Sequence, residues 1–216
     1  MQARVLLLPG FACTADIWQS VLSLLAPEID AAAVDWPAEN LKSYESVDDL
    51  AAWLLKTQPC ADFDLLVGHS MGGLVMLSAA AKMPNATPVG LVESFLLSPG
   101  PLFQNLLMPD AAPDLVKRVQ AMMAVERMRF SARLAPALRQ LDLSGTSLRP
   151  GMRVRALYGD RGCGDPEKVR AALRWPDTLR DRIPATVAEH ACHFPMLENP
   201  AATARAIRAW VEEFAV

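Results

Sequence analysis

One short segment constrains the fold more than any other: a serine between glycines that directly follows an apolar run. The run Phe63–Val67 is typical of a buried strand, and Gly68-His69-Ser70-Met71-Gly72-Gly73 comes next. The small-residue stretch 74–81 that follows is typical of a helix. A sharp turn between strand and helix needs glycine where the backbone passes close to its neighbours. The spacing therefore predicts that the Ser70 hydroxyl is held clear of a sheet as a candidate nucleophile; the alternative is a serine that only caps the helix.

Apolar runs and longer helical patterns alternate along most of the chain. Strands are predicted at Val5–Leu8, Ile29–Val34, Phe63–Val67, Leu91–Leu97, Val154–Tyr158 and Ala185–Ala188. Helices are predicted after Ser70 and at Trp18–Leu25, Val47–Leu55, Glu167–Leu173 and Ala201–Phe214. Continuously apolar strands separated by crossover helices predict a doubly wound α/β fold with a mostly parallel sheet of about six strands.

The stretch from about residue 100 to about 150 breaks this rhythm, because it shows no convincing strand. It is rich in Met and Arg, with helical patterns at Leu115–Phe130 and Ser131–Leu141. We expect a single domain over residues 1–216 in which this stretch is a small helical cap. The alternative is an ordinary long crossover built from two helices.

Composition narrows the classes of partner. The net charge of −3 gives no basic field for nucleic acid or an anionic membrane. No apolar run approaches the roughly 20 residues that cross a bilayer. The apolar start of the chain is interrupted at Pro9-Gly10, which favours a strand over a signal peptide. The four cysteines form no Cys-x-x-Cys pair, so we expect reduced thiols and a cytoplasmic location. We also expect a monomer or weak homodimer.

A serine hydroxyl needs a base to accept its proton, and the chain has three histidines. His69 lies inside the Ser70 turn, where adjacent side chains point apart. His190 and His193 follow the last predicted strand, where a loop can carry an imidazole across the strand ends. A nucleophile early in the chain and a base near its end match the order expected for this class of sheet.

An anion formed at a substrate carbonyl needs hydrogen-bond donors. The first strand leads into Pro9-Gly10-Phe11. The backbone N–H groups of Phe11 and of Met71 are candidates for this oxyanion hole. By itself, Pro9-Gly10 favours a simple turn.

Three blocks together resemble the α/β-hydrolase superfamily: Leu7-Leu8-Pro9-Gly10-Phe11, the Ser70 turn, and His193-Phe194-Pro195-Met196-Leu197-Glu198-Asn199-Pro200. Within it, the chain resembles small carboxylesterases of the kind that includes pimeloyl-carrier-protein methyl ester esterase. The resemblance implies Ser70 as nucleophile, His193 as general base, Phe11 and Met71 as oxyanion donors, and no cofactor. In one respect the chain departs from the family: we expect a fold that lacks the usual N-terminal edge hairpin.

The acid of the triad departs from the family pattern. The resemblance predicts Gly-x-x-Asp after Tyr158, but that slot holds Gly162. Asp160 is our first choice, with Asp165 as the alternative acid, although Asp165 also suits the N-cap of the next helix. A Ser–His pair without a carboxylate is the third option.

These residues predict a serine hydrolase that cleaves a carboxylic ester, with a small to medium, partly apolar acyl group, through an acyl-enzyme. A thioesterase, an amidase, a C–C bond hydrolase or a catalytically silent small-molecule-binding homologue are the alternatives on the same scaffold. No metal is predicted, because the spacing of Cys163, Cys192 and the nearby histidines matches no familiar zinc pattern.

Overall fold

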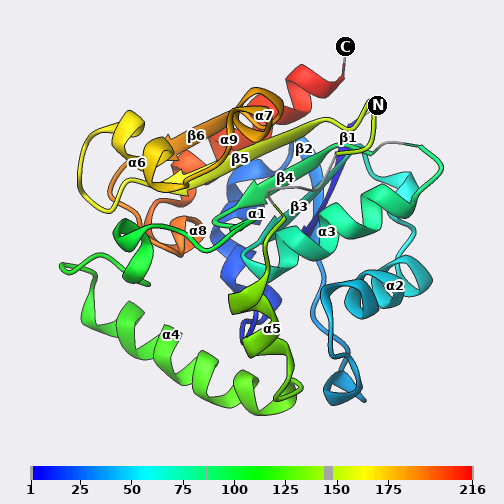
Figure 1. Cartoon of the computed structure of the whole chain (residues 1–216), viewed down its shortest axis with the longest axis horizontal. Helices are drawn as coiled ribbons and strands as arrows, with labels where there is room; N and C mark the ends of the chain where they lie inside the picture. The colour runs from blue at the N-terminus through cyan, green and yellow to red at the C-terminus, as the bar shows by residue number, and fades with distance from the viewer. Residues whose placement is uncertain (1, 86, 144–147, 216) are drawn as a thin grey trace.

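The computed structural model describes residues 2–85, 87–143 and 148–215. Its centre is a sheet of six parallel strands in the order β2-β1-β3-β4-β5-β6 (Figure 1). The strands are β1 Ala3–Leu8, β2 Ile29–Ala33, β3 Leu65–His69, β4 Val89–Val92, β5 Val154–Gly159 and β6 Ala185–Ala188. The predicted doubly wound sheet of about six parallel strands is confirmed.

Helices cover both faces of this sheet. The described α-helices are α1 Gln19–Leu25, α2 Val47–Thr57, α3 Met71–Lys82, α4 Pro113–Glu126, α5 Leu134–Gln140, α6 Pro166–Ala172, α7 Asp177–Arg182, α8 Pro195–Glu198 and α9 Pro200–Phe214. Buried side chains of α2, α3, α6 and α7 join one apolar cluster, and those of α1, α8 and α9 join the other. Each face of the sheet is therefore covered by apolar side chains, as expected for parallel strands.

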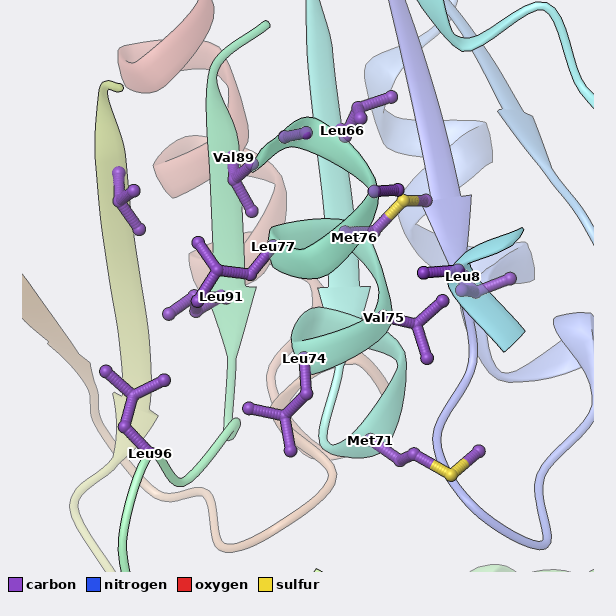
Figure 2. Packing of buried hydrophobic residues seen from close by; sticks show 14 of the residues in the cluster. Leu8, Leu66, Met71, Leu74, Val75, Met76, Leu77, Val89, Leu91 and Leu96 are labelled. Carbon is purple, nitrogen blue, oxygen red and sulfur yellow. The ribbon is translucent and has the colours of Figure 1, made fainter. Parts of the chain in front are cut away.

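The two clusters follow the two-residue period of the strands. In β1, Leu6 and Leu8 belong to the cluster under α3, whereas Val5 and Leu7 belong to the cluster under α9. Figure 2 shows α3 lying over the strands, with its labelled apolar side chains in the same cluster as Leu8, Leu66, Val89 and Leu91. Because both faces of the sheet are apolar, we expect the polar side chains of a functional site to lie at the strand ends and in the loops.

The fourth strand is shorter than the sequence predicts. The apolar run suggested Leu91–Leu97, but β4 ends at Val92. Glu93 then takes a φ of +52°, which turns the chain out of the sheet. The short helices α7 and α8 were not predicted either, since neither is long enough to show a clear helical period.

The segment between β4 and β5 holds the helices α4 and α5 and no strand among its described residues. In Figure 1 these helices lie beyond the ends of the strands, on the side of the molecule away from the two termini. Val119 of α4 packs into the cluster under α9, and Leu134 of α5 packs into the cluster under α3. The segment is thus anchored to both faces of the sheet. Among the described residues, no helix has the length and apolar character needed to span a membrane.

Candidate active site

Ser70 occupies a strained turn between β3 and α3. Its backbone has φ +52° and ψ −121°, a conformation that residues with a side chain rarely adopt. The flanking glycines make the turn possible. A Cβ added at Gly68 would lie 2.2 Å from the carbonyl carbon of Gly72, and one added at Gly72 would lie 2.3 Å from the carbonyl oxygen of Pro9. The Gly-x-Ser-x-Gly spacing is therefore a packing requirement as well as a motif.

Ser70 and Glu93 leave neighbouring strands at the same level. The register pairs His69 of β3 with Val92 of β4. Ser70 follows His69 and Glu93 follows Val92, so these two residues are level with each other. Both have a φ of +52°. The N–H of Ser70 donates to the carbonyl of Val92 at 2.8 Å, which joins the two turns directly.

The Glu93 carboxylate is fully buried and receives four hydrogen bonds. Oε1 accepts from the N–H of Gly159 at 2.6 Å and from Arg161 Nη1 at 2.5 Å. Oε2 accepts from Arg161 Nη2 at 2.5 Å and from His193 Nδ1 at 3.2 Å. The Arg161 side chain is itself only 3% exposed, so the ion pair is shielded from solvent.

This environment keeps Glu93 ionised. Burial alone would raise the pKa of its carboxyl, but the hydrogen bonds from Arg161 and His193 outweigh burial and hold the pKa below its usual range. Because a carboxylate only accepts hydrogen bonds, the Nδ1 atom of His193 carries the hydrogen between them. In the neutral ring, Nε2 is then the atom with the free lone pair.

The structure therefore places a different carboxylate beside His193 from the two that the sequence suggested. Asp160 is buried, but its Oδ1 accepts from the N–H of Gly162 at 2.8 Å, which closes its own turn. Asp165 caps α6 by accepting from the N–H groups of Glu167 and Lys168, as its alternative interpretation proposed. Neither has a contact with His193 among the described hydrogen bonds and ion pairs. The reason is local: each side chain satisfies the backbone N–H groups that follow it.

His193 is held beside the Ser70 turn through His69. The Nε2–H of His69 donates to the carbonyl of His193 at 2.8 Å, and the two ring centroids are 4.8 Å apart. Burial, together with the nearby charge of His193, puts the pKa of His69 well below its usual value, so His69 is neutral. His69 thus positions the loop that carries His193. His190 is exposed, in a turn with φ +50°.

The Ser70 side chain is half-buried, and its Oγ makes no hydrogen bond to another described residue. The structure thus brings the Ser70 turn, His193 and Glu93 together, without a hydrogen bond between the side chains of Ser70 and His193 among the described residues. Catalytic hydrogen bonds often tighten only when substrate is bound.

The N–H groups of Phe11 and Met71 are both free of acceptors within the described part of the chain. Met71 is the first residue of α3, where an N–H has no partner in its own helix. The carbonyl of Gly10 accepts from the N–H of Cys13 at 3.2 Å and from Trp36 Nε1 at 3.0 Å. Since the C=O and N–H of a trans peptide point in opposite directions, these bonds fix the direction of the Phe11 N–H.

Two cavities flank this site. One of about 240 Å³ is lined by Ser70 and Met71, by apolar side chains that include Leu74, Phe95 and Leu138, and by Arg139. Another of about 500 Å³ is lined by Phe11, Phe130, basic side chains and again Arg139. A cavity of about 550 Å³ lies near Gln2 and Phe214, away from Ser70. Ligand sites in parallel sheets lie at the carboxyl ends of the strands, which favours the two cavities near Ser70.

Three residues of the site were missed by sequence reasoning: Glu93, Arg161 and Trp36. A signal for Glu93 existed, because a charged residue inside an apolar run is out of place in a buried strand. If the strand is taken to end before Glu93, then Glu93 lies at the carboxyl end of its strand, as Ser70 does at the end of β3. No sequence signal indicates that Trp36 binds the Gly10 carbonyl. Among the described residues, no group of three or more His, Cys, Asp or Glu side chains is placed to hold a metal ion.

Solved structures share this fold at low identity. The esterase RhEst1 from Rhodococcus is 19% identical, with a TM-score of 0.69 over 99% of this chain and 91% of its own. An esterase from Thermogutta terrifontis is 18% identical, with a TM-score of 0.66 over 100% of this chain and 92% of its own. The 1H-3-hydroxy-4-oxoquinoline 2,4-dioxygenase is 18% identical, with a TM-score of 0.73 over 97% of this chain and 92% of its own. At these identities the likeness shows the fold alone.

The sequence itself is more decisive about family. No match is found among curated proteins, and the narrower resemblance to pimeloyl-carrier-protein methyl ester esterase is not confirmed. The model of the alpha/beta hydrolase family matches residues 5–206, which include the Ser70 turn, Glu93 and His193. The chain therefore belongs to the alpha/beta hydrolase family.

Proposed function

We propose that the protein is a serine hydrolase that cleaves carboxylic esters through an acyl-enzyme intermediate. The observation that carries the proposal is the Glu93–His193 pair beside the Ser70 turn. With Glu93 Oε2 bound to Nδ1 at 3.2 Å, the imidazole presents Nε2 as a proton acceptor. A serine on a strained turn, an oriented imidazole and a buried carboxylate are the parts of a nucleophilic triad.

In the first half of the reaction, Ser70 Oγ forms a bond to the ester carbonyl carbon, and its proton moves to His193 Nε2. The carbonyl electron pair moves to oxygen, where the N–H groups of Phe11 and Met71 stabilise the anion. When the carbonyl re-forms, the bond to the alcohol oxygen breaks, and the alcohol takes the proton from His193. Ser70 is left acylated.

Water completes the cycle by the same route. Its oxygen adds to the acyl carbon while His193 Nε2 takes a proton. The bond to Ser70 Oγ then breaks, and that oxygen recovers the proton. Throughout, the negative charge of Glu93 stabilises the imidazolium and fixes the tautomer of His193. Arg161 holds the Glu93 carboxylate in place with two hydrogen bonds.

The apolar cavity beside Ser70 favours a substrate with an apolar part. Leu74, Phe95 and Leu138 line it, and Leu138 comes from α5. We therefore assign the segment with α4 and α5 as a cap that covers the reacting ester and excludes water from it.

A fluorophosphonate probe tests the proposal, because it labels serines that are activated as nucleophiles. We expect labelling of the wild type, none in Ser70→Ala, and unchanged labelling in Ser78→Ala, a serine on the same helix whose hydroxyl bonds to Asp48. Hydrolysis of 4-nitrophenyl esters is expected to fall on the order of 10⁶-fold in Ser70→Ala and in His193→Ala. If well-folded wild type is not labelled by the probe and hydrolyses none of a set of 4-nitrophenyl esters of increasing acyl length, the proposal is contradicted and a binding protein is favoured.

A further inference from the structure

We propose that the substrate of Ser70 carries an anionic group, a carboxylate or a similar oxyanion, which Lys42, Arg127 and Arg139 bind. This inference rests on the proposed function and adds the chemical class of the ester to it. It concerns the cavity of about 500 Å³ that lies on the Phe11 side of the site, which we call the basic cavity.

The basic cavity adjoins the reacting centre. Its lining includes Phe11, whose N–H is one of the two proposed oxyanion donors. The smaller cavity includes Ser70 and Met71, the nucleophile and the other donor. Arg139 lines both cavities, so they share a wall, and its guanidinium is placed to meet a ligand in either one.

The charge in the basic cavity has one sign. Lys42 comes from the segment before α2, Arg127 follows α4 and Arg139 belongs to α5. No Asp or Glu is among the described residues that line it. Three cations converging from separate elements create a positive potential that favours an anion at their centre.

The neighbouring arginines of the same segment behave differently. Arg129 forms an ion pair with Glu126 and also donates to the carbonyl of Pro37 at 3.0 Å. Arg133 forms an ion pair with Glu45 at 2.8 Å. In contrast, Lys42, Arg127 and Arg139 have no carboxylate partner within the described chain. The paired arginines lie outside the cavity lining, and the three unpaired cations lie in it.

Apart from Ser131, the remaining side chains that line the basic cavity are apolar. The rings of Phe11 and Phe130 are in contact in the basic cavity, with centroids 4.7 Å apart and an angle of 47° between their planes. Met128 also lines the cavity, with 71% of its surface exposed. Aromatic and thioether surface next to guanidinium groups suits an anion on a short apolar stem, because each part of the ligand then finds a matching contact. A neutral ester would leave these three exposed cations paired only with solvent, whereas an anionic ester gives them a charged partner.

The test compares esters that differ only in charge. The first pair is mono-4-nitrophenyl adipate and the ester whose terminal carboxylate is replaced by a carboxamide. The second pair is 4-carboxyphenyl hexanoate and 4-carbamoylphenyl hexanoate, which place the carboxylate or carboxamide on the alcohol part of the ester instead of the acyl part. We expect kcat/KM to be about tenfold to a hundredfold higher for the anionic member of at least one pair, as charge-assisted hydrogen bonds imply. The preference should shrink as salt is added.

Variants separate this site from general electrostatics. Arg139→Gln should remove most of the preference for the anionic ester, and Arg127→Gln should reduce it. Arg133→Gln is the matched control, since it removes one positive charge from the same segment but from an arginine paired with Glu45, and it should leave the preference intact. A preference lost equally in Arg133→Gln would overturn the site.

The two proposals fail in different ways. If both members of each pair are hydrolysed equally, with activity abolished in Ser70→Ala, the anionic site is wrong and the serine hydrolase stands. If no ester is hydrolysed and the fluorophosphonate does not label Ser70, the proposed function itself fails. Fluorescence titration of Ser70→Ala with adipate then measures whether the basic cavity binds a carboxylate without catalysis; absence of binding overturns the anionic site as well.

Discussion

The turns that follow β4 and β5 are neighbours, and each carries a buried carboxylate, but the two acids do different things. Glu93 follows β4 and faces away from its own turn, toward Arg161 and His193. Asp160 follows β5 and folds back onto the N–H of Gly162. The difference shows that burial at the carboxyl end of a strand does not make a carboxylate part of a triad. What decides it is which group the carboxylate faces.

Side-chain length explains part of the contrast. An Asp side chain is short enough to bond an N–H two residues ahead, and this is a common way for a turn to close. Glu has one more methylene, and Glu93 uses it to reach two other loops. As a result, Glu93 joins the ends of β4, β5 and the His193 loop, whereas Asp160 stabilises only its own turn.

The largest expected effect separates these two acids directly. Glu93→Gln removes the charge that stabilises the His193 imidazolium, so kcat should fall on the order of 10³- to 10⁴-fold. Asp160→Asn keeps a group that can accept from Gly162, so kcat should fall less than about tenfold, with any loss appearing in stability. Steady-state kinetics on a 4-nitrophenyl ester measures both. The reverse result would return Asp160 to the triad and reduce Glu93 to a structural ion pair.

The next effect comes from the partner of Glu93. Arg161→Met leaves a buried carboxylate without its counter-ion, and the free energy of unfolding should fall by roughly 3–5 kcal/mol. Urea denaturation measures the loss. In the double variant Glu93→Gln, Arg161→Met the buried charge is gone, so the loss should be smaller than the sum of the two single variants. Additive losses would mean that the two side chains do not depend on each other.

The ionised state of Glu93 also affects how the stability of the protein depends on pH. Because the pKa of Glu93 is lowered on folding, the unfolded chain binds more protons than the folded chain in acid. The stability that Glu93 contributes is thus present above about pH 4.5, its ordinary pKa, and is lost as pH falls through the lower folded value. Between about pH 5 and about pH 3, wild type should lose more stability than Glu93→Gln. Parallel losses in the two proteins would contradict an ionised Glu93.

The smallest effect concerns the other acid after β5. Asp165→Ala removes the N-cap of α6, where Asp165 accepts from Glu167 and Lys168. The free energy of unfolding should fall by about 1 kcal/mol. Because this helix end makes no described contact with His193, kcat should stay within about twofold of wild type. A large loss of kcat without loss of stability would show that the α6 N-terminus acts on the reaction.

Much of this molecule was predictable from local patterns. The strand, turn and helix around Ser70 followed from glycine spacing, and the two faces of the sheet followed from apolar runs separated by helical periods. The position after the last strand indicated His190 and His193 alike, and the family resemblance at His193-Phe194-Pro195 selected His193. The N-cap at Asp165 was also predictable, since a cap involves only residues close in sequence.

The partnership of Glu93 with His193 was beyond such reasoning, because it joins residues 100 apart in the chain. It depends on the order of strands in the sheet, which places β4 between β3 and β5, and on the register that sets Glu93 level with Ser70. The same holds for Arg161 and for the cations around Arg139, which come together only when separate elements pack. By itself, the sequence determined the strained turn and the helix caps, since these depend on neighbours along the chain, and it indicated a parallel sheet through the alternation of apolar strands with helices. The tertiary structure decided which charges meet, because electrostatic partners are chosen by distance in space.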